Sequence, residues 1–74
     1  MNQADFDPEY VFSHHAITPE KVLQFEAIHT AAKQFAQILI ENTPPCTDQR
    51  SALRLLREAT MMANAAIALD GRLS

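Results

Sequence analysis

The chain has 74 residues, of which 47% are hydrophobic and 20% charged, and its net charge is −3. This length allows one domain at most, which excludes a two-domain enzyme. The hydrophobic share is typical of a folded chain rather than a disordered one. The negative charge excludes a general attraction to duplex DNA or to an anionic membrane, so any bound anion needs a local pocket.

Residues 1–17 differ in composition from the rest of the chain, and we call them the arm. Acidic and aromatic residues dominate its first twelve positions, and the aromatic ones are Phe6, Tyr10 and Phe12. The segment from Pro8 to Ser13 predicts a short helix capped by Asp7. Because these aromatic side chains carry too much apolar area for a free tail, we expect the arm to fold back onto the chain or onto a neighbouring subunit.

A first long helix is predicted from about residue 19 to 41. Thr18 is suited to cap it, Pro19 suits the first helical position, and Glu20 is favourable near the helix N-terminus. Apolar residues then recur at spacings of three and four, which is typical of a helix with one packed face. They are Val22, Phe25, Ile28, Ala32, Phe35 and Leu39.

A second long helix is predicted over about residues 48–69. Pro44 and Pro45 break the first helix, Thr47 or Asp48 is the expected N-cap, and Gly71 is the expected stop. A connection this short makes the two helices antiparallel neighbours. The sequence therefore predicts one all-α domain, with an arm over residues 1–17 and a helical hairpin over residues 18–74.

The second helix is apolar almost all round its circumference. Its apolar residues are Leu53, Leu55, Leu56, Ala59, Met61, Met62, Ala63, Ala65, Ala66, Ile67, Ala68 and Leu69. A helix of this kind is usually buried on several sides, whereas a hairpin gives it one partner. We therefore expect a homo-oligomer with a shared core around this helix. The alternative is a monomer with an irregular apolar surface.

The sequence offers little for catalysis or metal binding. Cys46 is the only cysteine, so no intramolecular disulfide or thiolate cluster forms. His14 and His15 are adjacent and point apart in a regular element, so they do not chelate one ion. No Gly-rich phosphate loop occurs, and we expect no enzyme and no cofactor. Neither a signal peptide nor an apolar run of about 18 residues is present, so we expect a cytoplasmic protein without membrane contact.

Three arginines, Arg50, Arg54 and Arg57, share one face of the second helix. One interpretation pairs them with Glu58 and with Glu41 or Glu26 of the antiparallel helix. The other makes them a basic rail for phosphates, since the guanidinium is planar and matches phosphate geometry. Both interpretations remain open from the sequence.

Three stretches of the chain resemble the phage anti-CBASS protein 2 family. They are residues 12–20, with FSHH followed by TPE, residues 25–36, with FEAIHTAAKQFA, and residues 56–68, with LREATMMANAAIA. The resemblance covers essentially the whole folded part. Members of this family are sponges that bind and sequester cyclic oligonucleotide messengers.

The resemblance implies a protein that inhibits host CBASS antiviral immunity by sequestering the messenger in the host cytoplasm without cleaving it. Family members form homohexamers whose subunits have a short N-terminal helix and two long antiparallel helices. They bind cyclic dinucleotides such as 3′,3′-cyclic GMP–AMP (cGAMP) between subunits, and some also hold cyclic trinucleotides. A flat residue before the first long helix stacks on a base, and a basic residue on that helix contacts a phosphate.

Carried over to this chain, His14 stands where the family has a stacking tyrosine, immediately before the matching His15. Tyr10 and Phe12 are the alternative stacking residues.

On the first long helix, the resemblance places His29 at the position of the family's basic, phosphate-contacting residue. Thr30 beside it is suited to hydrogen-bond a phosphate oxygen. We include Lys33 among the ligand-binding candidates. A cyclic dinucleotide brings two negative charges and two flat bases, so a few donors and two stacking faces suffice.

A different class of function also fits the residues. A small oligomeric helical adaptor or regulatory protein would bury its apolar second helix against a protein partner. A DNA-binding repressor ranks last, because neither long helix has the basic surface of a recognition helix.

Overall fold

Thr18 and Pro19 determine where the first long helix begins. In the computed structural model, which describes residues 6–73, helix α2 runs from Pro19–Asn42. The Thr18 hydroxyl accepts a hydrogen bond from the Lys21 backbone N–H at 3.2 Å, and Pro19 takes the first helical position. The predicted N-cap is therefore confirmed.

Side chains satisfy the last carbonyls of α2 where the prolines prevent the helix from continuing. The Asn42 amide donates to the Ile38 carbonyl at 2.8 Å, and the Thr43 hydroxyl donates to the Leu39 carbonyl at 2.6 Å. The Gln49 amide then donates to the Thr43 carbonyl at 3.2 Å, which ties the loop to the next helix. The loop is thus held by its own polar groups.

Helix α3, Thr47–Ala68, begins one position earlier than predicted. Its N-cap is Cys46, without a side-chain capping bond, so the predicted N-cap at Thr47 or Asp48 is wrong. The physical reason is that the extended backbone reaches as far as Cys46, whose carbonyl accepts the first helical bond from the Arg50 N–H at 3.1 Å. Asp48 instead lies in the first turn, where its charge is favourable to the helix dipole.

The C-terminal end of α3 is closed by two consecutive residues with left-handed backbone, Asp70 (φ 55°) and Gly71 (φ 72°). The Gly71 N–H donates to the Ala66 carbonyl at 2.9 Å, and the Asp70 N–H donates to the Ile67 carbonyl at 3.3 Å. This pair of bonds is the Schellman arrangement, which usually has glycine at the position that Asp70 occupies. The predicted stop at Gly71 is therefore one residue beyond the first left-handed position.

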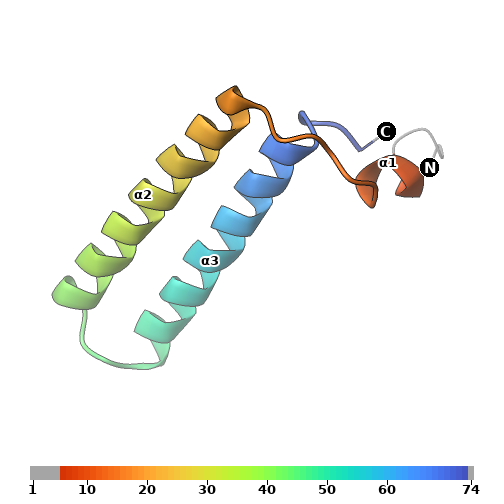
Figure 1. Cartoon of the computed structure of the whole chain (residues 1–74). Helices are drawn as coiled ribbons and strands as arrows, with labels where there is room; N and C mark the ends of the chain where they lie inside the picture. Colours follow the sequence, from red (N-terminus) through yellow and green to blue (C-terminus); the bar gives the residue numbers. More distant parts are fainter. Residues whose placement is uncertain (1–5, 74) are drawn as a thin grey trace.

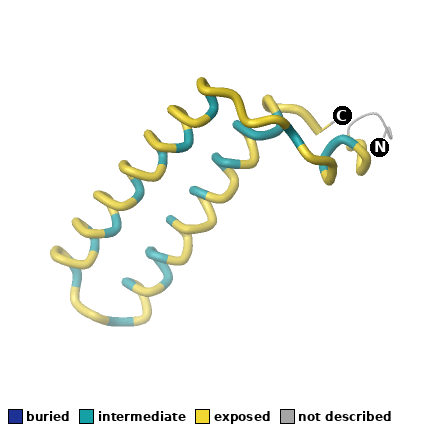
Figure 2. The backbone as a smooth tube through the Cα atoms, in the orientation of Figure 1, coloured by how far each residue is buried: buried dark blue, intermediate teal, exposed yellow. Residues whose placement is uncertain are grey.

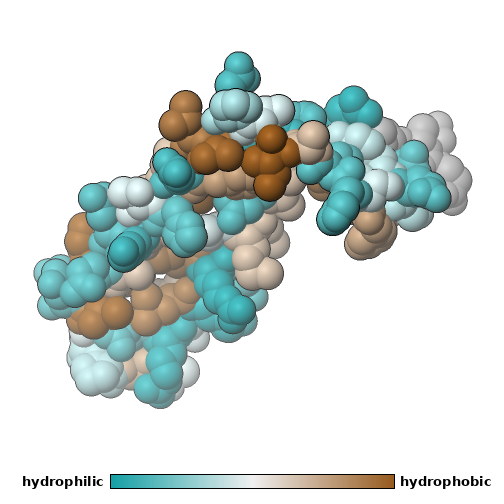
Figure 3. Space-filling view, viewed as in Figure 1, coloured by the Kyte–Doolittle hydropathy of each residue, from teal (hydrophilic) through white to brown (hydrophobic). Residues whose placement is uncertain are grey.

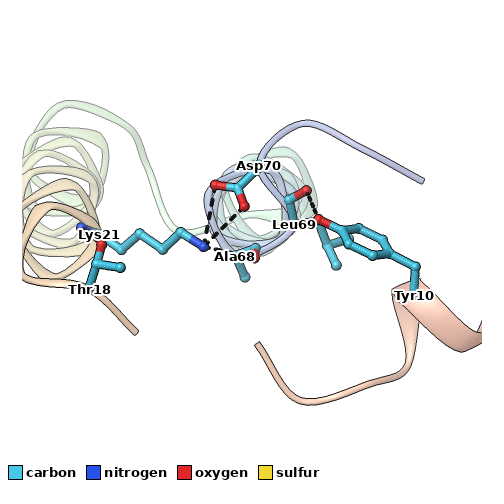
Figure 4. Close-up of polar contacts among 6 residues, drawn as sticks. All are labelled: Tyr10, Thr18, Lys21, Ala68, Leu69 and Asp70. Carbon is cyan, nitrogen blue, oxygen red and sulfur yellow. Dashed lines mark hydrogen bonds and ion pairs between the residues drawn. The ribbon is translucent and has the colours of Figure 1, made fainter. Parts of the chain in front are cut away.

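Two further side chains reach the same helix end from opposite sides (Figure 4). From α2, the Lys21 ammonium donates to the Ala68 carbonyl at 3.3 Å and lies 3.3 Å from an Asp70 carboxylate oxygen. From the arm, the Tyr10 hydroxyl donates to the Leu69 carbonyl at 2.6 Å. The exposed carbonyls of the last turn are thus satisfied from two other parts of the chain.

Helix α1, Pro8–Val11, is the short helix of the arm. Asp7 caps it by accepting a hydrogen bond from the Glu9 backbone N–H at 3.0 Å, as the sequence predicts. The Asp7 backbone N–H in turn donates to the Leu73 carbonyl. The described part of the arm, residues 6–17, therefore lies beside the C-terminal segment, beyond the end of the hairpin (Figure 1), while positions 1–5 of the predicted arm lie outside the described residues.

The two long helices form a single layer with no deep interior (Figure 2). The molecule measures 45 × 33 × 14 Å, and its radius of gyration is 15.7 Å, against about 11 Å for a compact domain of this length. The thinnest dimension is little more than one helix diameter of about 10–12 Å. Accordingly, no residue between 6 and 73 is fully buried.

The helices contact each other along a narrow strip on each. The half-buried apolar residues of this strip are Phe25, Ile28, Ala32 and Leu39 on α2, and Leu53, Leu56, Ala63 and Ile67 on α3. Val22 and Phe35, which the apolar spacing assigns to the packed face, are 40% and 54% exposed. The spacing selects a wide face, but a single partner helix covers only its middle.

The remaining apolar side chains of α3 face away from α2. Leu55, Met61 and Met62 keep 56%, 59% and 72% of their surface exposed. Figure 3 shows hydrophobic side chains at the surface near both ends of α2. The all-helical hairpin is confirmed, and its apolar surface extends well beyond the contact between the two helices.

The Lys21 contact yields a stability prediction. Lys21→Met keeps the apolar stem and removes the ammonium, so the Ala68 carbonyl loses its donor and the helix dipole loses a cation. We expect the free energy of unfolding to fall by about 1 kcal/mol. Urea unfolding followed by circular dichroism, at one fixed protein concentration, measures the change.

Asp70→Asn is the matched control for this prediction. Asparagine tolerates the left-handed backbone, and the Asp70 side chain is 61% exposed, so its ion pair contributes little. We expect a smaller loss than for Lys21→Met. Equal losses would contradict a stabilising role for the bond to the Ala68 carbonyl.

Candidate ligand-binding site

One turn of α2 forms a polar hollow on the surface. His29, Thr30 and Lys33 line a space of about 510 Å³, and all three residues are exposed. Their spacing places His29 and Lys33 on one side of the helix, with Thr30 beside them. The hollow therefore offers an imidazole, a hydroxyl and an ammonium to a ligand.

The arm contains a second cluster, centred on Tyr10. The Arg72 guanidinium lies 4.5 Å from the centre of the Tyr10 ring, which is a cation–π distance. The His15 ring meets the Tyr10 ring edge-on, with 4.6 Å between centroids, and His15 Nε2 lies 2.6 Å from the Tyr10 carbonyl oxygen. With its hydroxyl on Leu69, Tyr10 is held on three sides.

Phe12 and His14 are open to solvent by contrast. Phe12 is 81% exposed, and its nearest aromatic neighbour is Phe6, with 6.4 Å between ring centroids. Phe12 also borders a space of about 300 Å³ together with Pro8, Glu9 and Ser13. His14 is exposed as well. Phe12 and His14 thus both have rings that are accessible for stacking.

The structure divides the predicted site residues into two groups. His29, Thr30 and Lys33 lie together on α2, whereas Tyr10 and His15 lie together in the arm. The turn that carries His29 is about 15 Å along α2 from its start at Pro19. Within one chain, the hollow on α2 and the hollow beside Phe12 have no lining residue in common.

Two apolar hollows lie on the open surfaces of α3. One holds about 240 Å³ between the long helices, and it is lined by Ile28, Ala31, Ala32, Phe35, Leu56, Ala59, Thr60 and Ala63. The other holds about 290 Å³ at the C-terminal end, and it is lined by Met62, Ala65, Ala66, Leu69, Gly71, Arg72 and Leu73. Small side chains on α3 leave both hollows open to another molecule.

Two cations in these contacts were missed by sequence reasoning. Lys21 and Arg72 take no part in the predicted site, yet one closes the end of α3 and the other covers Tyr10. The signal for Lys21 is its place at the start of α2, opposite the end of an antiparallel α3. The signal for Arg72 is its place after the left-handed Gly71, which turns the chain toward the arm.

The three arginines of α3 follow neither sequence interpretation completely. Arg54 lies 3.8 Å from Glu58 within the same helix. Ion pairs from these arginines to Glu41 or Glu26 of α2 do not occur in the described part of the chain. Arg50 and Arg57 thus remain exposed without a carboxylate partner there.

Residues 6–73 contain neither a metal-binding cluster nor a membrane-spanning helix. No group of three or more histidine, cysteine or acidic side chains is placed to hold a metal ion. None of the helices in that range is long and apolar enough to cross a membrane. Comparison of the chain with protein-family models, curated proteins and solved structures gave no match.

The Tyr10 contacts yield a prediction about the arm. Tyr10→Phe keeps the ring that Arg72 covers but removes the hydroxyl that donates to Leu69. We expect faster limited proteolysis within the arm, because one of its few links to the hairpin is lost, and a loss of about 1 kcal/mol in stability.

Phe12→Leu is the control, since Phe12 is 81% exposed and its ring makes no hydrogen bond. Its proteolysis rate should stay close to that of the unmodified protein. An unchanged rate for Tyr10→Phe would show that the hydroxyl does not hold the arm.

Proposed function

We propose that this protein is a non-catalytic sponge for cyclic oligonucleotides, of the kind that phages use against CBASS immunity. The observation that carries the proposal is the hollow lined by His29, Thr30 and Lys33. The family resemblance points to His29 and Thr30, Lys33 is the third ligand-binding candidate on α2, and all three line the same hollow. The expected ligands are cyclic dinucleotides such as 3′,3′-cGAMP and, by the same resemblance, cyclic trinucleotides.

The chemistry of the hollow suits a phosphodiester. The Lys33 ammonium and the Thr30 hydroxyl donate hydrogen bonds to phosphate oxygens, and the His29 ring adds one more donor or a flat surface. A protein with a net charge of −3 binds such an anion through these local donors rather than through its overall field. Base stacking on aromatic side chains adds about 1–3 kcal/mol per base.

Assembly supplies what one chain lacks. The open apolar surface of α3 supports a homo-oligomer, for which we propose the hexamer that the resemblance implies. In such an assembly, the arm of a neighbouring subunit brings Phe12 or His14 to the hollow on α2. A two-fold axis between subunits would present the same groups twice, which matches the near-symmetry of a cyclic dinucleotide.

The proposed function requires no bond to be broken. A sponge present in excess over its ligand, with tight affinity, lowers the free messenger below the level that its effector needs. The rival proposal, a helical adaptor, rests on the same apolar surface of α3 but gives no role to His29, Thr30 and Lys33. The two proposals therefore differ in whether small nucleotides bind.

The first test is a calorimetric titration of the purified protein with 3′,3′-cGAMP. We expect tight binding near one ligand per two subunits, and chromatography after heat denaturation should recover the nucleotide intact. His29→Ala should weaken binding at least several-fold without changing the oligomer, because it removes one side of the hollow. Absence of heat with common cyclic di- and trinucleotides would favour the adaptor.

Gln34→Ala is the matched control for His29→Ala. Gln34 is exposed on α2 but does not line the hollow, so affinity should stay unchanged. Equal weakening by both substitutions would argue for a general effect on α2 rather than for a contact with the ligand.

A second test concerns assembly. Ala63 lines the apolar hollow between the helices, so Ala63→Glu places a charge where another subunit is expected to pack. We expect light scattering to show dispersed subunits and calorimetry to show loss of binding. Ala27→Glu, at an exposed position outside the described hollows, is the control. Normal binding by dispersed Ala63→Glu would contradict a site between subunits.

A further inference from the structure

The two long faces of the hairpin differ in chemistry. The apolar hollow between the helices includes Ala31 and Phe35 of α2 and Ala59 of α3, so these residues lie on one face. An α-helix turns about 100° per residue, and two positions therefore correspond to about 200°. Lys33 is two positions from both Ala31 and Phe35, which places it on the opposite face.

The same reasoning places Arg57 on the face of Lys33. Arg57 is two positions before Ala59 on α3, so it lies about 200° around that helix, away from the apolar hollow. Because α2 and α3 pack side by side (Figure 1), we assign the sides that point away from this hollow to one common face. His29 lies on this face too, since it is two positions before Ala31.

Lys33 and Arg57 also lie at the same level along the hairpin. At one end of the hairpin Lys21 of α2 contacts Asp70, just after α3, and at the other end Thr43, just after α2, contacts Gln49 of α3. Because the helices are antiparallel, the residue numbers increase along α2 in the direction in which they decrease along α3. Lys33, shortly before Phe35, is therefore level with the turn of α3 that begins at Arg57. The axes of packed helices usually lie about 8–10 Å apart, a distance that long side chains from the two helices can bridge.

Neither cation is neutralised by the described residues. The ion pairs in that part of the chain join Lys21 to Asp70 and Arg54 to Glu58. Glu58 is thus engaged by Arg54, and among residues 6–73 no carboxylate lies within ion-pair distance of Lys33 or Arg57. Two like charges side by side repel each other, and an anion bound between them removes that repulsion.

We propose that Arg57 is a second phosphate-binding residue of the site, so that a phosphodiester of the ligand lies between the Lys33 ammonium and the Arg57 guanidinium. This inference rests on the proposed function and extends the site from one helix to two. The planar guanidinium offers paired N–H donors that match the phosphate oxygens, whereas Lys33 acts as a point charge.

Glu26 determines which end of the site receives the phosphate. It lies on α2 one turn before His29 and two turns before Lys33, and it has no ion-pair partner among residues 6–73. Its carboxylate repels a phosphate placed near His29 but is farther from one placed at Lys33. The ligand therefore lies with its phosphate toward Lys33 and Arg57 and with a base toward the His29 ring.

The experiment compares two arginines on one helix by calorimetric titration with 3′,3′-cGAMP. Arg57→Ala should weaken binding about tenfold, the scale of one lost charged hydrogen-bonding partner. Arg54→Ala removes the same charge from α3 but from a side chain already paired with Glu58, and it should change the affinity less than twofold. Both variants should keep the melting temperature within a few degrees, because neither residue is buried.

Arg57→Lys separates charge from geometry. If the guanidinium binds two phosphate oxygens, lysine should recover only part of the affinity that alanine loses. Glu26→Gln removes the opposing charge and should strengthen binding. Equal losses for Arg57→Ala and Arg54→Ala would reduce the effect to general electrostatics and would overturn the proposal, as would an unchanged affinity for Arg57→Ala.

The outcomes separate this inference from the proposed function. If the unmodified protein binds no cyclic nucleotide, the proposed function fails before any arginine is replaced. If the unmodified protein and Arg54→Ala bind while Arg57→Ala binds equally well, the sponge function stands and the role of Arg57 is wrong.

Discussion

A single layer of two helices cannot enclose an interior, and this constraint governs the whole molecule. Each long helix has one neighbour, so each side chain has protein on one side and solvent on the other. The described residues accordingly include none that is fully buried. Hydrophobic burial within one chain is therefore small, since its free energy scales with the apolar area removed from water. The composition of α3, apolar around most of its circumference, is typical of a helix with more packing partners than one hairpin supplies.

Polar contacts connect the three parts of the chain where a core does not. The C-terminal turn of α3 receives donors from the start of α2 and from the arm, through Lys21 and Tyr10. The last carbonyls of a helix have no hydrogen-bond partner within the helix. Here they accept hydrogen bonds that position the start of α2 and the arm. The end of α3 thus joins the three parts of the fold, mainly through its backbone carbonyls and the Asp70 carboxylate.

The sequence predicts the local structure well because local signals are strong. Thr18 and Pro19 locate the start of α2, and Asp7 and Pro8 locate the start of α1. What spacing cannot give is the extent of burial, because a stripe of apolar residues does not reveal how many partners cover it. Phe35 belongs to the stripe by spacing and is more than half exposed in the hairpin.

In the candidate site, too, the local relations between residues are predictable from the sequence and the long-range ones are not. That His29 and Lys33 share one side of a helix is a local property, and the sequence predicts it. The arrangement of Tyr10 under Arg72 depends on the left-handed turn at Asp70 and Gly71, which joins residues far apart in the chain. The level of Arg57 relative to Lys33 likewise depends on how the helices pass each other. Such long-range relations need the folded structure.

The bond between Asp7 and Leu73 brings positions near the two ends of the chain side by side. A short peptide linker between these positions would not have to cross the molecule, and the loop at Pro44 and Pro45 is an exposed place for new ends. The fold is thus suited to circular permutation, in which α3 precedes the arm and α2. In that order, the contacts at the end of α3 become local, and the contact between the long helices becomes the long-range one.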